Sequence, residues 1–319
     1  MISIFIYYQK EMVVITVERL EDILNCKIQA WNTLLSINLN NSNITSLPPE
    51  VNRWTSATDI YLYGNQLTSL PDAVKGWSSA TCIYLHNNQL TLLPDAVRGW
   101  TSATLIDLGG NQLISLPDAV SGWSSATTIF LSNNQLTLLP DGVSGWTSAR
   151  YIYLGGNQLT SLPDGVSGWT SATDISLHGN RLTSLPDAVS SWTSARDIYL
   201  GGNQLTSLPN AVSGWTSATD IFLHGNPILF VDDNLCCKCK KGMYLNDLFF
   251  SLKNKKKIQD RYACKIQKIY RSYYNKKRYN AAVTIQRAFI DHFYRVHGPW
   301  YNKTYKKYLT FKCVPIKHH

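Results

Sequence analysis

The sequence has few charged residues, only three methionines and no long apolar run. Charged residues make up 16% of the chain, below the roughly one quarter typical of soluble domains, so uncharged polar residues must supply much of its surface. No stretch approaches the roughly 18 consecutive apolar residues of a membrane-spanning helix. The apolar start MISIFIYY lacks a basic residue and a cleavage site. We therefore expect neither a signal peptide nor a transmembrane segment.

A disulfide framework is also unexpected, because the seven cysteines are odd in number and unevenly spaced. A reducing compartment is the simpler interpretation, and we expect an intracellular, cytoplasmic protein. Cys236, Cys237 and Cys239 resemble half of a zinc knuckle, with Cys264 as the nearest further candidate ligand. Free cysteine thiols in the cap that follows the repeats explain the same residues, so we predict neither a metal nor a cofactor.

The charges that are present are unevenly distributed. Residues 1–30 carry three basic and four acidic groups, residues 31–234 carry six and fourteen, and residues 235–319 carry twenty-one and three. The formal net charge of +9 therefore combines an acidic middle with a strongly basic end. Such a split indicates two parts that have different partners or that attract each other.

The acidic middle is an internal repeat of 23 residues, W-[TS]-S-A-T-x-I-x-L-x-x-N-Q-L-T-S-L-P-D-A-V-S-G. A period of this length, with apolar residues at fixed offsets, predicts a solenoid in which no unit can bury its core alone. One tryptophan opens each unit: Trp31, Trp54, Trp77, Trp100, Trp123, Trp146, Trp169, Trp192 and Trp215.

Each conserved position of the unit has a physical role, which we describe for residues 54–76. Ile60 and Leu62 alternate with polar residues, which predicts a short strand with these two side chains inward. Asn65 follows the strand, where a buried amide can bond to the backbone of neighbouring turns and form a ladder. Pro71 suits the start of a short outer helical or 3₁₀ turn. Gly76 is expected to end that turn with a positive φ.

The pattern L-x-x-L-x-L-x-x-N-x-L-x-x-L-P resembles the leucine-rich repeat and covers residues 31–234. The resemblance implies an α/β solenoid, a curved horseshoe of about nine units with a parallel sheet on its concave face. We expect residues 1–30 to form an N-terminal cap, with a short amphipathic helix at 18–24, and residues 235–253 to form a C-terminal cap or linker. Ala57 and Trp77 stand where the family has leucine, which we interpret as an exchange of volume within the core. An aromatic ligand-binding box is the alternative interpretation of the tryptophans.

The outward strand positions form the predicted contact surface. Exposed aromatic rings beside carboxylates offer rigid contact area and charge, and the resemblance implies that a protein partner binds there. Alternatively, the rings are cross-strand pairs that only stabilise the sheet. The predicted partner-binding residues are Asp59, Tyr61, Tyr84, Phe130, Tyr151, Tyr153, Asp174, Asp197, Tyr199, Asp220 and Phe222.

Other features of the repeats do not predict catalysis. His86, His178 and His224 lie too far apart along the array to share a metal, and the recurrent GGN is typical of a turn. We identify no nucleophile with its base, no paired-carboxylate cleft and no glycine-rich phosphate loop. The sequence therefore favours a protein that is not an enzyme.

The basic end contains a predicted helical region at residues 254–297, followed by a basic tail at 298–319. Apolar residues recur there at steps of three and four, opposite a face rich in lysine and arginine. Two segments resemble the IQ motif, I-Q-x-x-x-R-G-x-x-x-R, the second of them less closely. The resemblance implies that a calmodulin-type protein binds a helix through these residues: Ile266, Gln267, Arg271, Lys276, Ile285, Gln286 and Arg295.

Three other interpretations of the basic end stay open. It packs against the end of the solenoid, it lies on the acidic repeats as an intramolecular latch, or it tethers the chain to an anionic membrane or a nucleic acid. The favoured hypothesis is a non-enzymatic scaffold that binds one protein partner through its repeats and a calmodulin-type protein through its tail.

Overall fold

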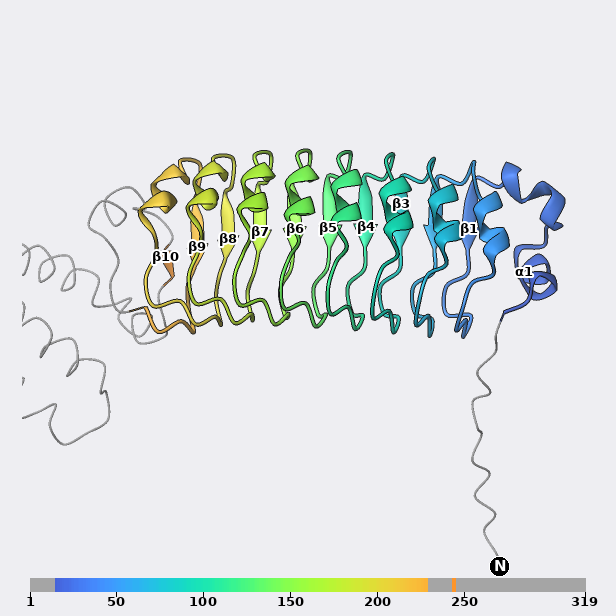
Figure 1. The fold of residues 1–319 in the computed structure, drawn as a ribbon, viewed down its shortest axis with the longest axis horizontal. Helices are drawn as coiled ribbons and strands as arrows, with labels where there is room; N and C mark the ends of the chain where they lie inside the picture. Colours follow the sequence, from blue (N-terminus) through green and yellow to red (C-terminus); the bar gives the residue numbers. More distant parts are fainter. Residues whose placement is uncertain (1–14, 229–242, 245–319) are drawn as a thin grey trace, which may run out of the picture. The chain divides into compact units, whose positions relative to one another are not determined.

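The computed structural model describes residues 15–228 and 243–244 (Figure 1). The chain divides into two compact units, Met1–Asp247 and Leu248–His319. The second unit, and with it the predicted IQ-like helices, the basic tail and Cys264, lies outside the described residues. Cys236, Cys237 and Cys239 lie outside them as well.

The described part of the first unit is a solenoid whose strands form one parallel sheet in chain order (Figure 1). Neighbouring strands of the repeats pair with a shift of 23 residues, so that Ile60 lies opposite Ile83. The strands are β1 (Ser36–Asn38), β2 (Asp59–Tyr61), β3 (Cys82–Tyr84), β4 (Leu105–Asp107), β5 (Thr128–Phe130), β6 (Tyr151–Tyr153), β7 (Asp174–Ser176), β8 (Asp197–Tyr199), β9 (Asp220–Phe222) and β10 (Met243–Tyr244).

The last strand, β10, is not one of the nine predicted repeats. It lies in the segment that we expected to be a cap or linker, and it pairs with β9 in parallel. The sheet therefore continues beyond the repeat sequence by two residues of backbone.

Each strand returns to the next through a loop and a short 3₁₀ helix on the other side of the core. The predicted helical turn is thus present, but it begins at Asp72, with Pro71 as the preceding cap residue. The 3₁₀ helices are η1 (Ile28–Thr33), η2 (Pro49–Arg53), η3 (Asp72–Gly76), η4 (Asp95–Gly99), η5 (Asp118–Gly122), η6 (Asp141–Gly145), η7 (Asp164–Gly168), η8 (Asp187–Ser191) and η9 (Asn210–Gly214).

The predicted amphipathic helix is present as α1 (Val17–Leu24), which closes the N-terminal end of the core. The Thr16 hydroxyl caps its first turn by accepting a hydrogen bond from the Arg19 amide at 3.2 Å. Leu20 is fully buried in the same apolar cluster as the repeat residues. The cap thus covers apolar surface that the first repeat would otherwise expose.

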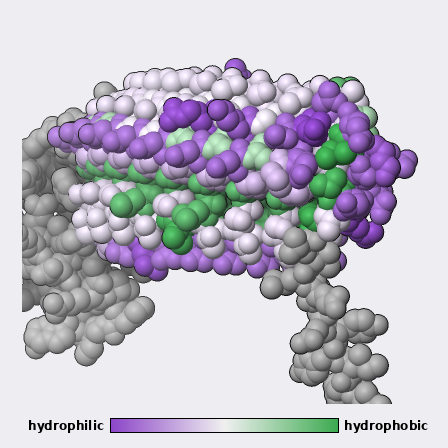
Figure 2. Space-filling model, turned by 45° about the vertical axis from the view of Figure 1, so that its right-hand side comes forward, coloured by the Kyte–Doolittle hydropathy of each residue, from purple (hydrophilic) through white to green (hydrophobic). Residues whose placement is uncertain are grey.

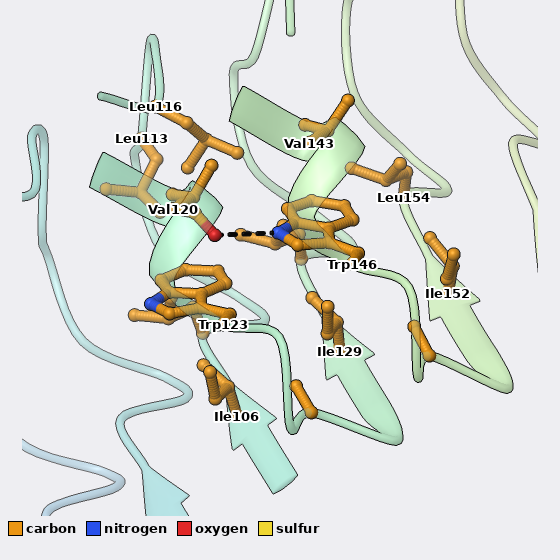
Figure 3. Packing of buried hydrophobic residues seen from close by; sticks show 14 of the residues in the cluster. Ile106, Leu113, Leu116, Val120, Trp123, Ile129, Val143, Trp146, Ile152 and Leu154 are labelled. Atoms are coloured by element: carbon orange, nitrogen blue, oxygen red, sulfur yellow. Dashed lines mark hydrogen bonds between the residues drawn. The ribbon is translucent and has the colours of Figure 1, made fainter. Parts of the chain in front are cut away.

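The tryptophans are core residues, as the first of the two interpretations predicts. Trp31 to Trp192 are completely buried, and neighbouring indoles lie 5.6–6.1 Å apart between ring centroids. Trp146 donates its indole N–H to the carbonyl oxygen of Val120 in the preceding 3₁₀ helix at 3.1 Å (Figure 3). Each such bond satisfies a buried donor and fixes the spacing of two units.

The Asn ladder is also confirmed. Asn65 and its equivalents are buried, and each amide bonds to backbone groups of its own and the preceding unit. Asn88, for example, donates from Nδ2 to the carbonyl oxygens of Leu62 and Leu85, and its Oδ1 accepts the Leu67 amide at 3.0 Å. These bonds satisfy polar backbone groups that the turns would otherwise leave buried and unpaired.

The expectation for Gly76 is wrong. Its φ is not positive; instead, a Cβ at Gly76 would lie 2.5 Å from the Asn52 carbonyl oxygen, because adjacent 3₁₀ helices pack closely. Ser191 stands at the equivalent position of η8, so the packing can adjust to a side chain. Each unit instead has a left-handed residue in the turn after the strand, and the first unit has a second one at Asn43. The residue in the turn is always Gly or Asn: Asn41, Gly64, Asn87, Gly110, Asn133, Gly156, Gly179, Gly202 and Gly225.

The spacing of aromatic residues indicates the sense of curvature. Stacked rings on the solvent side of the sheet lie 4.6–5.1 Å apart, whereas the indoles behind the sheet lie 5.6–6.1 Å apart. Successive units are therefore closer together at the sheet than at the indoles. This is the sense that places the sheet on the concave side, as the resemblance implies.

Candidate functional site

The candidate site is the solvent side of the sheet, formed by the first and third residues of β1–β9, which we call the sheet face. The middle residue of every one of these strands is an isoleucine, and all nine are buried. The flanking residues therefore project to the opposite side. All eleven predicted contact residues lie on this face, and the strand register aligns them in two rows.

Aromatic side chains of the second row stack in pairs across neighbouring strands. Tyr61 and Tyr84 lie 5.1 Å apart, and the ring planes differ by 8°. Phe130 stacks on Tyr153 at 4.9 Å, and Tyr199 stacks on Phe222 at 4.6 Å. Each ring thus covers a face of its neighbour, which holds it in place and lowers the entropy that a partner must remove on binding.

Two polar residues separate these aromatic pairs. Asp107 lies between Tyr84 and Phe130 in the row, and Ser176 lies between Tyr153 and Tyr199. The second row is therefore a repeated arrangement of two rings and one polar side chain, with a period of three units.

Carboxylates gather at the C-terminal end of the first row. Asp174, Asp197 and Asp220 lie opposite one another on β7, β8 and β9. Burial, and then the charges of Asp174 and Asp220, raise the pKa of Asp197. The row is thus a negative patch in which like charges repel.

Threonines that precede the strands position two of the carboxylates. Thr58 donates its hydroxyl hydrogen to Asp59 Oδ2 at 2.8 Å, and Thr173 donates to Asp174 Oδ2 at 2.7 Å. These bonds restrict the rotamers of Asp59 and Asp174 before any partner arrives.

The structure also brings together an acid and a histidine that the sequence did not associate. His86 Nδ1 lies 2.9 Å from Asp107 Oδ2, and the His86 ring stacks on Tyr63 at 4.6 Å. Burial raises the pKa of Asp107, whereas the Gly109 amide and His86 oppose that shift. His86 follows β3 and Asp107 ends β4, so the two residues occupy different columns of neighbouring units, and the 23-residue period alone does not associate them.

A second contact corrects the expectation that no nucleophile lies beside a base. Ser176 Oγ and His178 Nδ1 are 2.7 Å apart, because two residues of one chain segment turn toward each other after β7. Ser176 is only 4% exposed, however, and a buried hydroxyl is out of reach of a substrate. Within residues 15–228 and 243–244, no three His, Cys, Asp or Glu side chains are grouped as metal ligands would be.

Four tyrosines of the sheet face, Tyr61, Tyr84, Tyr153 and Tyr199, have a raised pKa. The Asp59 charge raises the pKa of Tyr61, and burial raises the pKa of Tyr84. Burial and then nearby aspartates raise the pKa of Tyr153 and Tyr199. Their hydroxyl groups therefore remain hydrogen-bond donors at neutral pH.

Exposed apolar residues are also found away from the sheet face. Leu92, Ile114 and Leu138 are each about half exposed and follow the turns of three consecutive units, where other units have threonine or serine. Hydrophobic patches run lengthwise along the repeats between hydrophilic rows in Figure 2.

Comparison with solved structures identifies the fold as that of leucine-rich-repeat proteins. A plant peptide hormone receptor, RGFR1 in complex with RGF2, aligns with a TM-score of 0.56 at 21% identity, over 69% of this chain and 38% of that chain. The crystal structure of PEPR1-AtPEP1 aligns with a TM-score of 0.54 at 21% identity, over 63% and 30%. This chain therefore spans about a third of the length of either.

An LRR protein of Leptospira interrogans also matches, with 19% identity over 67% of this chain and 85% of that chain, at a TM-score of 0.36. No protein-family model and no curated protein sequence matches the chain. In the part of the chain that the structure describes, none of the helices is long and apolar enough to cross a membrane.

Proposed function

We propose that the chain is a non-enzymatic interaction scaffold whose sheet face binds a protein partner. The observation that carries this proposal is the arrangement of stacked aromatic pairs and carboxylates in register along one open face. The rings are held by their neighbours, so that binding costs little side-chain entropy, and the carboxylates supply charge for orientation.

The alternative, that the rings only stabilise the sheet, does not account for Tyr151. This side chain is 41% exposed at the centre of the face, and it lies opposite Asp174 and Thr128 rather than another aromatic residue. Aromatic residues of this kind are enriched where proteins bind each other. PEPR1-AtPEP1 and RGFR1 in complex with RGF2 share the fold, and the second of these is a peptide hormone receptor with a bound partner.

Site-specific photo-cross-linking tests the proposal. A benzoylphenylalanine at Tyr151 on the sheet face should give a protein adduct of defined mass in extract from the native source. The matched control carries the same group at Ser144, an exposed residue of η6 on the opposite side, and should give no such adduct. The adduct should disappear when Tyr153 and Tyr199 are replaced by serine. Identical adducts from both positions, or none from Tyr151, would contradict a binding role for the face.

We also propose that the basic end recruits a calmodulin-type protein, on the basis of its IQ-like residues alone. A peptide of residues 254–297 should bind calmodulin, and Ile266→Glu with Ile285→Glu should abolish binding, because a charge cannot enter the apolar lobe that Ile266 would fill. If the peptide instead binds anionic vesicles or nucleic acid, and the two changes have no effect, the tail is an electrostatic tether.

A further inference from the structure

We propose that the C-terminal part of the sheet face, β7–β9, binds an extended protein segment that carries arginine or lysine at alternate positions. This inference rests on the proposed function and names the chemistry of the partner. The surface concerned consists of the carboxylates Asp174, Asp197 and Asp220 and the stacked rings of Tyr199 and Phe222. We call it the acidic–aromatic surface.

The three carboxylates are not a requirement of the fold. At the same position β3, β4 and β5 have Cys82, Leu105 and Thr128, and these strands pair in the same register. Three like charges side by side on neighbouring strands destabilise a sheet. In an array of nearly identical units, such an arrangement costs stability without improving packing, which is typical of a surface that meets a positively charged group.

The charges of this surface are not neutralised by the ion pairs of the described residues. Those pairs are Lys27–Glu21 and His86–Asp107, and neither includes the acidic–aromatic surface. Arg196 is nearby and lowers the pKa of Asp197, but less than Asp174 and Asp220 raise it. The described residues therefore leave a net negative field, which extends over the Tyr199 ring.

The neighbouring rings favour arginine or lysine over a simple cation. Guanidinium and ammonium groups bind the face of an aromatic ring and a neighbouring carboxylate together, and their alkyl stems cover apolar surface. Tyr199 and Phe222 stand directly beside Asp197 and Asp220, two residues further along the same strands. One basic side chain can therefore contact a ring and a carboxylate at once.

The spacing of the carboxylates suits alternate residues of an extended segment. Strands are about 4.8 Å apart, so the three carboxylates span about 10 Å. In an extended chain, side chains at alternate positions point to one side and are about 7 Å apart. Two or three long basic side chains at alternate positions therefore reach the whole row.

Fluorescence anisotropy with the full-length chain tests this inference, with a labelled peptide of alternating arginine and serine as the probe. Asp174→Asn, Asp197→Asn and Asp220→Asn together should weaken binding about tenfold, the effect of losing three partly exposed ion pairs. The matched control replaces Asp72, Asp95 and Asp118 by Asn. These are exposed residues on η3–η5 and change the net charge equally, so binding should change by less than about twofold.

A second probe with the same composition, but with its arginines in one block, tests the spacing and should bind more weakly than the alternating peptide. Absence of binding by the alternating peptide, equal losses in both triple variants, or equal affinity for both peptides would overturn the inference. If the three Asn changes leave the Tyr151 cross-link intact, the proposed function stands and this inference falls. If the cross-link is also absent from the wild-type chain, both fall.

Discussion

Asn134 Nδ2 donates a hydrogen bond to the Leu108 carbonyl oxygen of the preceding unit at 3.0 Å, and its Oδ1 accepts the Leu113 amide at 3.0 Å. One side chain thus joins two units at their turns. Because the same arrangement recurs along the array, it holds the strands in the register that forms the sheet face.

Replacing Asn134 by alanine should lower the free energy of unfolding by about 3 kcal/mol, since three buried hydrogen bonds are lost. The Leu108 and Leu131 carbonyl oxygens keep bonds from Asn111 and Asn157, but the Leu113 amide is left without its acceptor. Denaturant titration measures the change, with the exposed neighbour Gln135→Ala as control. Similar values for the two variants would show that the ladder contributes little.

The tryptophan column offers a matched pair of substitutions. Trp123 donates its indole N–H to the Val97 carbonyl oxygen at 3.1 Å, whereas the buried Trp54 Nε1 has no acceptor among the described residues. Both side chains are fully buried. Changing either to phenylalanine removes a similar volume, but only Trp123→Phe breaks a hydrogen bond.

Trp123→Phe should therefore destabilise the protein by about 1 kcal/mol more than Trp54→Phe, the usual contribution of such a bond. Chemical denaturation of both variants tests this difference. A larger loss for Trp54→Phe would mean that its indole N–H does find a partner.

The positive φ of the turn position predicts which substitutions of its glycine are tolerated. Gly179 has a φ of +62°, and a Cβ there would meet nothing closer than 3.5 Å. Gly179→Ala should cost about 1 kcal/mol from conformational strain alone. Gly179→Asn should cost less, because Asn87 and Asn133 adopt this conformation in other units. Thermal unfolding of both variants tests this, and the Asn variant should have the higher Tm. A higher Tm for the Ala variant would exclude backbone strain as the cause.

The raised pKa of Asp197 predicts a pH dependence of stability. The pKa of Asp197 is higher in the folded than in the unfolded chain. Its carboxyl group therefore contributes most to the stability of the fold below the unfolded-state pKa, and this contribution is lost as the pH rises through the folded-state pKa. At pH 7 repulsion within the row of carboxylates therefore destabilises the fold, and Asp197→Asn should stabilise it by about 0.5 kcal/mol.

This gain should shrink near pH 3, because protonation of Asp197, whose pKa is raised, removes its charge from the wild type. Unfolding at both pH values checks the sign. Asp72→Asn, at an exposed position outside the row, should show no such gain at pH 7. Destabilisation by Asp197→Asn at pH 7 would contradict repulsion along the row.

Much of the fold followed from the 23-residue period, because each position of the unit performs the same task in every copy. The inward isoleucines, the buried Trp column, the Asn ladder and the rows of the sheet face were all predicted in this way. Gly76 was not, because the sequence does not distinguish a glycine needed for close packing from one needed for positive φ. The conformational requirement is met by Gly64 and its equivalents instead.

The pairs within the candidate site were harder to predict. The contact between His86 and Asp107 joins different columns of neighbouring units, and the contact between Ser176 and His178 depends on side-chain direction after the strand ends. β10 has no repeat sequence, so its pairing with β9 could not be derived from the period. These features depend on departures from the repeat, for which the period gives no guide.

The most direct test of the account is the affinity of the partner identified through Tyr151 for two matched double variants. Tyr153→Ser with Tyr199→Ser removes rings from the sheet face, whereas Leu92→Ser with Leu138→Ser removes exposed apolar side chains elsewhere. By isothermal titration calorimetry, the first variant should bind about 100-fold more weakly, as loss of two aromatic anchors implies, and the second should bind within about twofold of the wild type. Unchanged affinity of the first variant, or an equal loss in both, would contradict the assignment of the sheet face as the binding surface.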